Sequence, residues 1–543
     1  MKRILTVLLT AVLIFSLSAC GKDKGSTDNS KGGTSDTDVT SSEIISTGTS
    51  STGTSSTDTS SADSTASVSS GSGKTVSYVT SEITVKKPNP NIPANTDRSW
   101  HENPAGLCFP VTGTLDNEAD EMRSKILSSN GSGVKITGTT YYVSEKGDDS
   151  NDGKSPKTAW ATPAGAEVHN ASLKSGDAVL FERGGVFRGS MKLASGVYYG
   201  AYGTGDRPCI YGSARNFADA VFTSDGKNIW RLREMFASDV GIIVFNHGEA
   251  VGNRVSSRAE LKSNYDFFCD TSDKNRVYLY FEEDPSKVFI SIEIGADSVL
   301  FRFDGQKNIT IENLTFKYTG GHAVRGSNTE NITVRNCEIG YVGGSYLDGY
   351  GDGKVRYGNG IELMSNSKNT LLENNWIYQI YDSGITHQGD NCVVENFTAK
   401  NNLIEFCGMG AIEYWHTKGA VIKSVLYEGN MLRFSGYGFG GLQRPDKNMS
   451  AAIQSNAKPT GSNYNYAESF IIRNNIFELS TYQLVNAASD AGTPPTLDGN
   501  TYIQVDGRWL GYYGKNTNIR FNKSSELIIK NTWNDASAKL AFA

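Results

Sequence analysis

Two glutamates hold equivalent places in a set of short, related segments in the second half of the chain. The segments are GHAVR at 321–325, NGIEL at 359–363, SGITH at 383–387, GAIEY at 410–414 and GFGGL at 438–442. Alternate residues of a strand face opposite sides of a sheet. If the apolar residue of each segment and Gly440 face inward, the next residue faces outward. The outward column is then Arg325, Glu362, Thr386, Glu413 and Gly441.

The two glutamates of this column could act as an acid–base pair. If the segments stack as neighbouring strands, Glu362 and Glu413 are two strands apart, or about 9.5 Å at the backbone. Inverting glycosidases hold their two carboxyl groups about 6.5–9.5 Å apart, and retaining ones about 5–5.5 Å. The spacing therefore indicates glycoside hydrolysis and favours inversion of the anomeric centre over retention. Asp382 precedes the intervening segment and could replace either glutamate; the alternative is that both glutamates are ordinary solvated residues of a sheet.

Polar and aromatic residues around the column predict a sugar-binding groove. Small residues (Ala323, Gly360, Gly384, Ala411) would leave a low floor, and Trp415 could stack on a sugar ring or, alternatively, between neighbouring strands. Strict alternation points His387 inward, where a core histidine is the competing interpretation. The candidate substrate-binding residues are His322, Arg325, Arg356, Asn359, His387, Gln388, Trp415, Gln443 and Arg444.

A repeated unit surrounds these segments. Asn375, Asn402 and Asn430 each precede an apolar pair and are 27 and 28 residues apart. Repeats of this length indicate stacked supersecondary units. Each unit contains short β-branched runs between Gly, Asn, Asp and Ser, with no helical periodicity. We therefore expect an all-β fold, a right-handed parallel β-helix from about Tyr141 to Asn500, with asparagine amides bonded from one coil to the next.

Several segments carry a resemblance to known β-helix proteins. The opening at 141–153, with WATP at 160–163 and GAYGTGDRP at 200–208, resembles the N-terminal coils of secreted proteins of the pectate-lyase superfamily. Residues 308–446 are similar to bacterial right-handed β-helix repeat proteins. Between 217 and 298 the coil rhythm stops, and this part resembles the antiparallel β-module inserted in certain β-helix glycosidases, among them a β-xylosidase family. The resemblance implies the fold and a carbohydrate-active protein, because the superfamily contains hydrolases, lyases, epimerases and adhesins alike.

Two other functions remain open. The insertion at 341–359 contains Asp348 and Asp352, which could bind calcium as oxygen ligands. Calcium would favour a polysaccharide lyase or epimerase acting on a uronate-containing glycan, with a base among Arg325, Lys354, Arg356 and Arg444. The column carries more acid than base, however, and would repel a polyuronate, so hydrolysis is the preferred prediction and no cofactor besides calcium is expected. A surface protein that binds glycan without cleaving it would need the same groove.

The N-terminus predicts an extracytoplasmic, lipid-anchored protein. Lys2 and Arg3 precede an apolar run that ends in LSAC at 17–20, which is too short to span a membrane and reads as a signal peptide. LSAC resembles the bacterial lipoprotein box, which implies lipidation of Cys20 and anchoring to the cell membrane. Residues 21–85 are rich in Ser, Thr and Gly and predict a disordered tether.

Composition sets further limits. The net charge of −6 argues against nucleic acid or an anionic membrane surface as the main partner, and we expect a monomer. No cysteine pair has CxxC spacing, so a zinc site is not predicted, whereas Cys108–Cys209 or Cys209–Cys269 could form a disulfide. The expected order is an irregular segment with a short helix (86–140), first coils (141–216), the module (217–298), main coils (299–505) and a C-terminal cap (506–543).

Overall fold

The computed structural model describes residues 113–131, 133–347, 349, 355–416, 419–445, 448–455, 466–488, 493–515 and 517–543. All of them belong to one compact unit, Val79–Ala543. The predictions for the signal peptide, the lipidation of Cys20, the tether, Cys108 and the calcium ligands Asp348 and Asp352 lie outside the described residues. No helix within the described ranges is long and apolar enough to cross a membrane.

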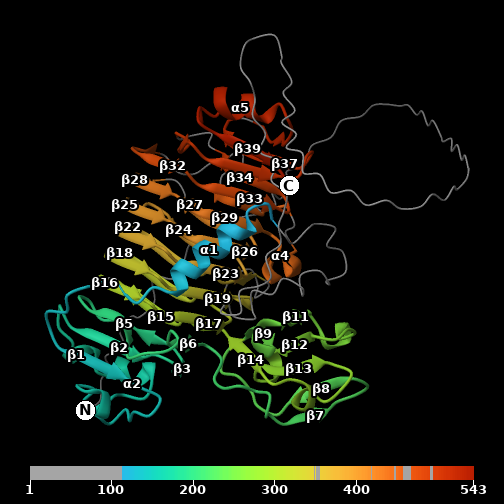
Figure 1. The fold of residues 1–543 in the computed structure, drawn as a ribbon. Coiled ribbons are helices and arrows are strands. Elements are labelled where there is room, and N and C mark those ends of the chain that lie inside the picture. Colours follow the sequence, from blue (N-terminus) through green and yellow to red (C-terminus); the bar gives the residue numbers. More distant parts are fainter. Residues whose placement is uncertain are drawn as a thin grey trace, which may run out of the picture. The chain divides into compact units, whose positions relative to one another are not determined.

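Parallel strands stack in coils with three faces, which confirms the predicted β-helix (Figure 1). The first two faces share one 19-stranded sheet, and the third is a separate 10-stranded sheet. The first face contains β15 (Phe301–Asp304), the starts of β18 (Val324–Arg335) and β22 (Ile361–Glu373), β24 (Ile385–Gly389), β27 (Gly410–His416), β30 (Ala451–Ser455), β34 (Gln483–Ala488) and β37 (Trp509–Gly514).

The second face follows the same coils around the first corner. It contains β16 (Lys307–Glu312), the ends of β18 and β22, β25 (Val393–Lys400), β28 (Val421–Glu428), β32 (Phe470–Arg473) and β35 (Thr496–Asp498). The third face contains β3 (Val186–Arg188), β6 (Cys209–Tyr211), β17 (Thr315–Thr319), β19 (Glu338–Val342), β23 (Trp376–Ile380), β26 (Leu403–Cys407), β29 (Met431–Ser435), β33 (Ile476–Ser480), β36 (Thr501–Gln504) and β39 (Lys539–Phe542).

The interior is filled by apolar residues that repeat from coil to coil. Val324, Ile361, Ile385, Ile412 and Ile453 are partners in adjacent strands and are fully buried. Burying an aliphatic side chain of this size contributes roughly 1.5–3 kcal/mol. Because the side-chain period of a strand is two, this inward column also fixes which residues face outward.

An asparagine ladder runs through the interior, as predicted. Each side-chain amide donates to the oxygen of the next one, at 2.9–3.1 Å, from Asn375 through Asn402, Asn430 and Asn475 to Asn500. The last amide donates to the carboxylate of Asp535 at 3.0 Å. Every amide of this ladder therefore has a partner, which is the condition for burying polar groups at low cost.

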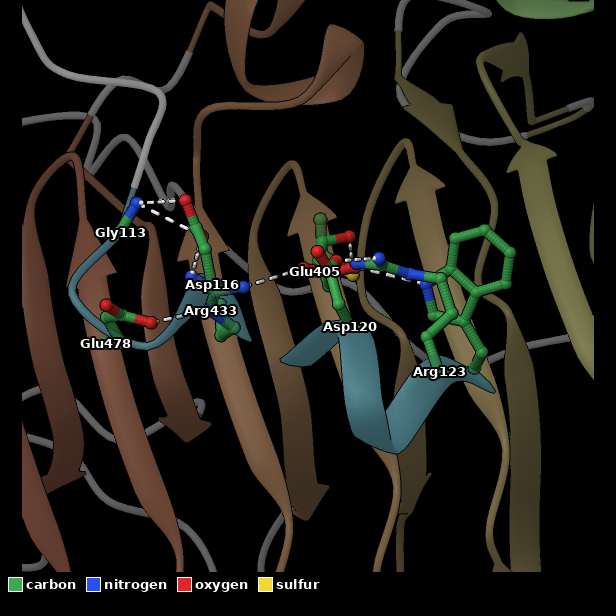
Figure 2. Close-up of polar contacts among 9 residues, drawn as sticks. Gly113, Asp116, Asp120, Arg123, Glu405, Arg433 and Glu478 are labelled. Atoms are coloured by element: carbon green, nitrogen blue, oxygen red, sulfur yellow. Dashed lines mark hydrogen bonds and ion pairs between the residues drawn. The ribbon is translucent and has the colours of Figure 1, made fainter. Parts of the chain in front are cut away.

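Helix α1 (Asp116–Leu127) lies against the third face and is fixed there by buried ion pairs (Figure 2). Arg433 bonds Glu478 at 2.5 Å and Glu405 at 3.3 Å and also pairs with Asp116 of the helix. Arg123 of the helix bonds Glu405 at 2.7 Å. A 12-residue helix is about 18 Å long, so α1 crosses several coils and ties them together. It agrees with the short helix expected within 86–140.

Between β6 and β15 the chain leaves the stack. Residues 217–298 contain β7 (Phe222–Ser224), β8 (Ile229–Leu232), β9 (Val240–Phe245), β10 (Ala250–Val251), β11 (Asn253–Arg254), β12 (Asp266–Asp270), β13 (Arg276–Tyr280) and β14 (Ile292–Ala296). They form two mainly antiparallel sheets with an apolar core of their own. Ile242 and Val244 of β9 pack with Tyr318 and Tyr341 of the third face, so the module rests on that face.

Two predictions about the coils are corrected. The segment at 438–442 is not a strand of the column, because α4 (Phe439–Gln443) replaces it. A side chain at Gly440 would come within 2.3 Å of the Tyr381 carbonyl oxygen, so these glycines allow the close approach of a helix. The coils also continue beyond Asn500, since β37 and β39 pair in parallel with β34 and β36; α5 (Ser525–Asn531) lies between them.

Candidate active site

The strand register brings the predicted outward residues into one column on the first face. Arg325 pairs with Glu362, Glu362 with Thr386, and Thr386 with Glu413. The next residue is Gln454 of β30, in place of the predicted Gly441. Glu362 and Glu413 are only 4% and 3% exposed although they face away from the core. The column is therefore recessed, which is the environment that shifts the pKa values of carboxyl groups.

Glu362 is surrounded by donors. Its Oε2 accepts hydrogen bonds from His322 Nε2 and Arg325 Nε, both at 3.0 Å. Its Oε1 accepts from Asn359 Nδ2 at 3.4 Å and from the Gln388 amide. Burial alone would raise the pKa of Glu362, but His322 and Arg325 outweigh it and lower the pKa to about 2. Glu362 therefore stays ionised at every physiological pH.

His322 is oriented by the backbone of the neighbouring coil. Its Nδ1 accepts a hydrogen bond from the Asn359 backbone N–H at 3.0 Å. Nδ1 is therefore unprotonated, and Nε2 carries the proton that it donates to Glu362. The ring also packs edge-on against Tyr357, with 5.0 Å between the ring centres. His322 and Asn359, both predicted to bind substrate, thus contact the candidate catalytic carboxylate.

Glu413 has the opposite environment. Its Oε2 accepts a hydrogen bond from Ser383 Oγ at 3.1 Å, and no ion pair reaches it from the described residues. Burial raises the pKa of Glu413 to about 7; the hydroxyls of Ser383 and Thr386 oppose the rise and the charge of Glu362 adds to it. Glu413 therefore keeps its proton to a much higher pH than an ordinary glutamate.

The two carboxyl groups differ in the way that acid–base chemistry requires. When two titratable groups have their pKa values pushed apart, one is available as an acid while the other stays charged. Here Glu413 can donate a proton, and Glu362 supplies a fixed negative charge two strands away. Because Glu362 already accepts four hydrogen bonds, it is a weak base and is better suited to stabilising positive charge.

Asp382 and Arg444 form a pair near the column. Arg444 Nη1 donates to Asp382 Oδ1, and the Gly358 backbone N–H donates to Oδ2 at 3.0 Å. The two side chains are 13% and 11% exposed, which is more than Glu362 or Glu413. Asp382 is therefore the more accessible carboxylate, held in place by a cation.

A second outward row lies beside the column. Met364, Gln388 and Trp415 are partners in β22, β24 and β27 and are partly exposed. Gln388 donates to Glu362, so this row touches the carboxylate column. Trp415 faces outward as predicted, where an indole face is available for stacking.

Arg356 and Gln443 do not have the substrate-binding role that was predicted for them. Arg356 Nε donates to the Gly344 carbonyl oxygen at 2.6 Å, and Nη2 donates to Gln443 Oε1 at 3.0 Å. Gln443 Nε2 in turn donates to the Gly252 carbonyl oxygen of the module at 2.7 Å. Burial lowers the pKa of Arg356 to about 10. These side chains join the module to the coils, so the structure does not support their prediction as substrate ligands.

The prediction that His387 binds substrate is also corrected. It lies in the interior, fully buried, with Nδ1 2.7 Å from His416 Nε2 and Nε2 2.5 Å from the Tyr427 hydroxyl. Burial and the neighbouring His416 lower the pKa of His387 well below its ordinary value. It is therefore a neutral core histidine, which is the competing interpretation from alternation.

The structure adds Ser383, Gln454 and Asn486 to the site. Gln454 follows Glu413 in the column, and Asn486 follows Gln454. A signal for Gln454 was present in the sequence, because AAIQS at 451–455 repeats the pattern of GAIEY at 410–414. Ser383 carries no such signal, since it lies in a turn before a strand. No cluster suited to a metal ion is found among the residues that the structure describes.

Comparison with known proteins supports the fold. A family model described as "Right handed beta helix region" matches residues 295–442, in agreement with the predicted hand. No curated protein matches the sequence. A solved "Glycoside hydrolase" is similar in structure with 10% identity and a TM-score of 0.43, over 75% of this chain and 96% of that chain.

Two further solved structures are similar at the same low level of identity. A complex of XylC with xylose has 15% identity and a TM-score of 0.37, over 68% of this chain and 71% of that one. An exopolygalacturonase from Thermotoga maritima has 10% identity and a TM-score of 0.31, over 74% of this chain and 98% of that one. At these values the likeness concerns the fold, so function has to be argued from the site.

Proposed function

We propose that the protein is a glycoside hydrolase that acts on a polysaccharide or its oligosaccharides, with Glu413 as general acid. The observation that carries this proposal is the opposite pKa shift of two buried carboxyl groups on one outward column. Glu413 donates its proton to the oxygen of the scissile glycosidic bond. The C–O bond breaks as positive charge develops on the sugar ring. A water molecule then supplies the hydroxyl group of the product, and its remaining proton returns to the Glu413 carboxylate.

Glu362 is the second carboxylate of the proposed mechanism. Its permanent negative charge stabilises the oxocarbenium-like transition state, and its four hydrogen bonds keep it in one orientation. Asp382 is the alternative, because it is nearer to solvent and its carboxylate could orient the attacking water. Trp415 stacks on a sugar ring, and Gln388 and Arg325 bond its hydroxyl groups.

The charges of the column favour a neutral or mixed glycan. Arg325 balances the charge of Glu362, His322 donates a hydrogen bond to it, and burial raises the pKa of Glu413 to about 7. Arg325 also pairs with Asp304 at 3.3 Å, so this guanidinium, one of the candidate bases of a lyase, is held by two carboxylates. These contacts support hydrolysis over β-elimination.

A glycan panel tests the proposal. Release of reducing ends without ultraviolet absorbance supports a hydrolase, whereas absorbance marks the unsaturated product of a lyase. Binding without either product indicates a glycan-binding protein. Glu413→Gln is the diagnostic variant and Glu373→Gln on the second face is the control. If the parent protein cleaves a glycan and Glu413→Gln cleaves it equally well, Glu413 is not the general acid.

We also propose that the enzyme is held at the bacterial cell surface by lipid on Cys20. The support is the LSAC sequence at 17–20, with Lys2 and Arg3 before the apolar run. Cys20→Ser should release the protein from membranes into the medium. Membrane retention of this variant would contradict the proposed lipid anchor. That result would not bear on the proposed hydrolase activity.

A further inference from the structure

Two amide side chains beyond Glu413 have buried oxygens without partners. Gln454 Nε2 donates to the Ser455 carbonyl oxygen at 3.0 Å, and Asn486 Nδ2 donates to the same oxygen at 3.3 Å. The Ser455 carbonyl oxygen is an acceptor, so it must face the NH₂ group of each side-chain amide. These bonds therefore fix which end of each amide is the oxygen. Gln454 Oε1 and Asn486 Oδ1 remain buried with no hydrogen-bond partner among the residues that the structure describes.

Unpartnered buried oxygens are unfavourable for the fold alone. Burying an acceptor without a donor costs the desolvation of that group, and folded proteins avoid it. Gln454 and Asn486 are 3% and 8% exposed, so bulk water does not satisfy them. The inner asparagine ladder shows that buried amides of successive coils can bond one another. On the outward column, the described residues supply no such donor to the oxygens of Gln454 and Asn486.

The two oxygens belong to the same column as the carboxyl groups. Glu413 pairs with Gln454, and Gln454 pairs with Asn486. They therefore follow Glu413 by about 4.8 and 9.5 Å along the stack. Tyr512 is the next residue of the column and is partly exposed, so an aromatic ring ends the row.

We propose that Gln454 and Asn486 form a subsite for a neutral sugar, whose hydroxyl groups donate to the two unpartnered oxygens. Tyr512 lies beside that sugar as a stacking surface. A uronate carboxylate does not fit, because it has no proton to donate and would face two acceptors. The opposite end of the column is cationic, with Lys192, Arg302 and Arg325 in register. The inference rests on the proposed function, since it identifies the sugar class next to the same carboxyl pair.

The test compares oligosaccharides of increasing length. Neutral gluco-, xylo-, manno- and galacto-oligosaccharides are used with the parent protein, Gln454→Leu and Asn486→Leu, beside oligogalacturonates of matched length. Thr398→Val on the second face is the control variant. Each leucine variant should reduce the ratio of kcat/KM for long over short neutral substrates by about two- to tenfold, the value of one hydrogen bond. An unchanged ratio would show that the oxygens hold water only.

Thermal melting keeps the test independent of folding. Leucine removes an unpartnered buried oxygen together with one hydrogen bond to the Ser455 carbonyl oxygen, which the other amide still partners. Both single variants should therefore melt close to the parent while they lose the longer substrates. A fall in melting temperature that accounts for the lost activity would overturn the subsite. Preference for oligogalacturonates over the neutral series that depends on Gln454 would also overturn it.

Failure of the proposed hydrolysis gives a different result. If the parent binds oligosaccharides without cleaving them, the hydrolase proposal fails, and the subsite is tested by calorimetry as a two- to tenfold rise in Kd for the leucine variants. If the parent neither cleaves nor binds any of them, both proposals fall. If the parent cleaves the oligosaccharides and the leucine variants keep its length dependence, only the subsite proposal is wrong.

Discussion

Two outward columns of the same β-helix differ in how their charges are partnered. On the second face, Glu312, Arg335, Glu373, Lys400, Glu428, Arg473 and Asp498 follow one another in register. Their signs alternate, with ion pairs such as Arg335–Glu312 at 3.2 Å, Lys400–Glu373 at 3.1 Å and Arg473–Glu428 at 2.6 Å. On the first face, Glu362, Thr386, Glu413 and Gln454 are consecutive and include no cation.

The difference separates structural charge from functional charge. In a solenoid, equivalent positions of successive coils are neighbours, so alternating signs satisfy every residue at once. The first face lacks this alternation between Glu362 and Asn486. Within the described part of the chain, Glu413 has no cation beside it and two amide oxygens have no donor. Such unfavourable groups are characteristic of sites that bind and react.

The largest expected effect comes from removing the proton of Glu413. Glu413→Gln should lower kcat about 10²- to 10⁴-fold, the usual contribution of a general acid. The amide keeps the size of the side chain, so the melting temperature should not fall. Steady-state kinetics on a cleaved glycan measure the effect. Retention of parental kcat would place the acid elsewhere on the column.

The next effect is a pH dependence of stability. The pKa of Glu413 is raised from 4.5 to about 7 in the folded protein. A raised pKa means that its contribution to stability is fully present below pH 4.5 and is lost as the pH rises to about 7. At 1.36 kcal/mol per pKa unit the change is about 3 kcal/mol. Chemical denaturation across this range should show the slope in the parent and a reduced slope in Glu413→Gln. The same slope in both would assign the titration to another group.

A smaller loss of stability is expected for Glu362→Gln. The substitution leaves Arg325 and His322 beside a neutral amide in a buried site. Breaking a buried ion pair usually costs 3–5 kcal/mol, but Arg325 is 26% exposed and keeps Asp304, so we expect about 1–3 kcal/mol. Urea denaturation at neutral pH measures it. No loss at all would mean that solvent compensates the charge of Arg325 and the lost hydrogen bond of His322.

The smallest effect is predicted on the alternating column. Glu373→Gln removes one partner of Arg335 and Lys400, at 3.6 and 3.1 Å, and each cation is at least partly exposed. Exposed ion pairs contribute about 0–1 kcal/mol, so stability should change by no more than that and turnover should stay at the parental level. A drop in kcat for this variant would remove the distinction between the two columns.

The fold could be predicted from the sequence because a strand period of two and a coil period near 27 residues are both local patterns. They placed Ile361, Ile385 and Ile412 inside and Glu362 and Glu413 outside. The same patterns failed at Gly440, where the close packing of a helix against another coil decides the conformation. The contacts of Arg356 and Gln443 also depend on the module, which the periodicity does not describe. The pKa values of the two glutamates follow from neighbours that lie 27 to 40 residues away, such as His322 and Ser383.

The position of α1 on the third face has a consequence for the timing of folding. The Leu115 backbone N–H, just before the helix, donates to Glu478 at 3.0 Å across 363 residues of sequence. Asp116 pairs with Arg433 across 317 residues, as Figure 2 shows. At about 5–20 residues per second, synthesis of the intervening chain takes roughly 20 to 70 s. The helix precedes every coil in the sequence, but the contacts of its N-terminal end with Arg433 and Glu478 cannot form until those late coils have been synthesised.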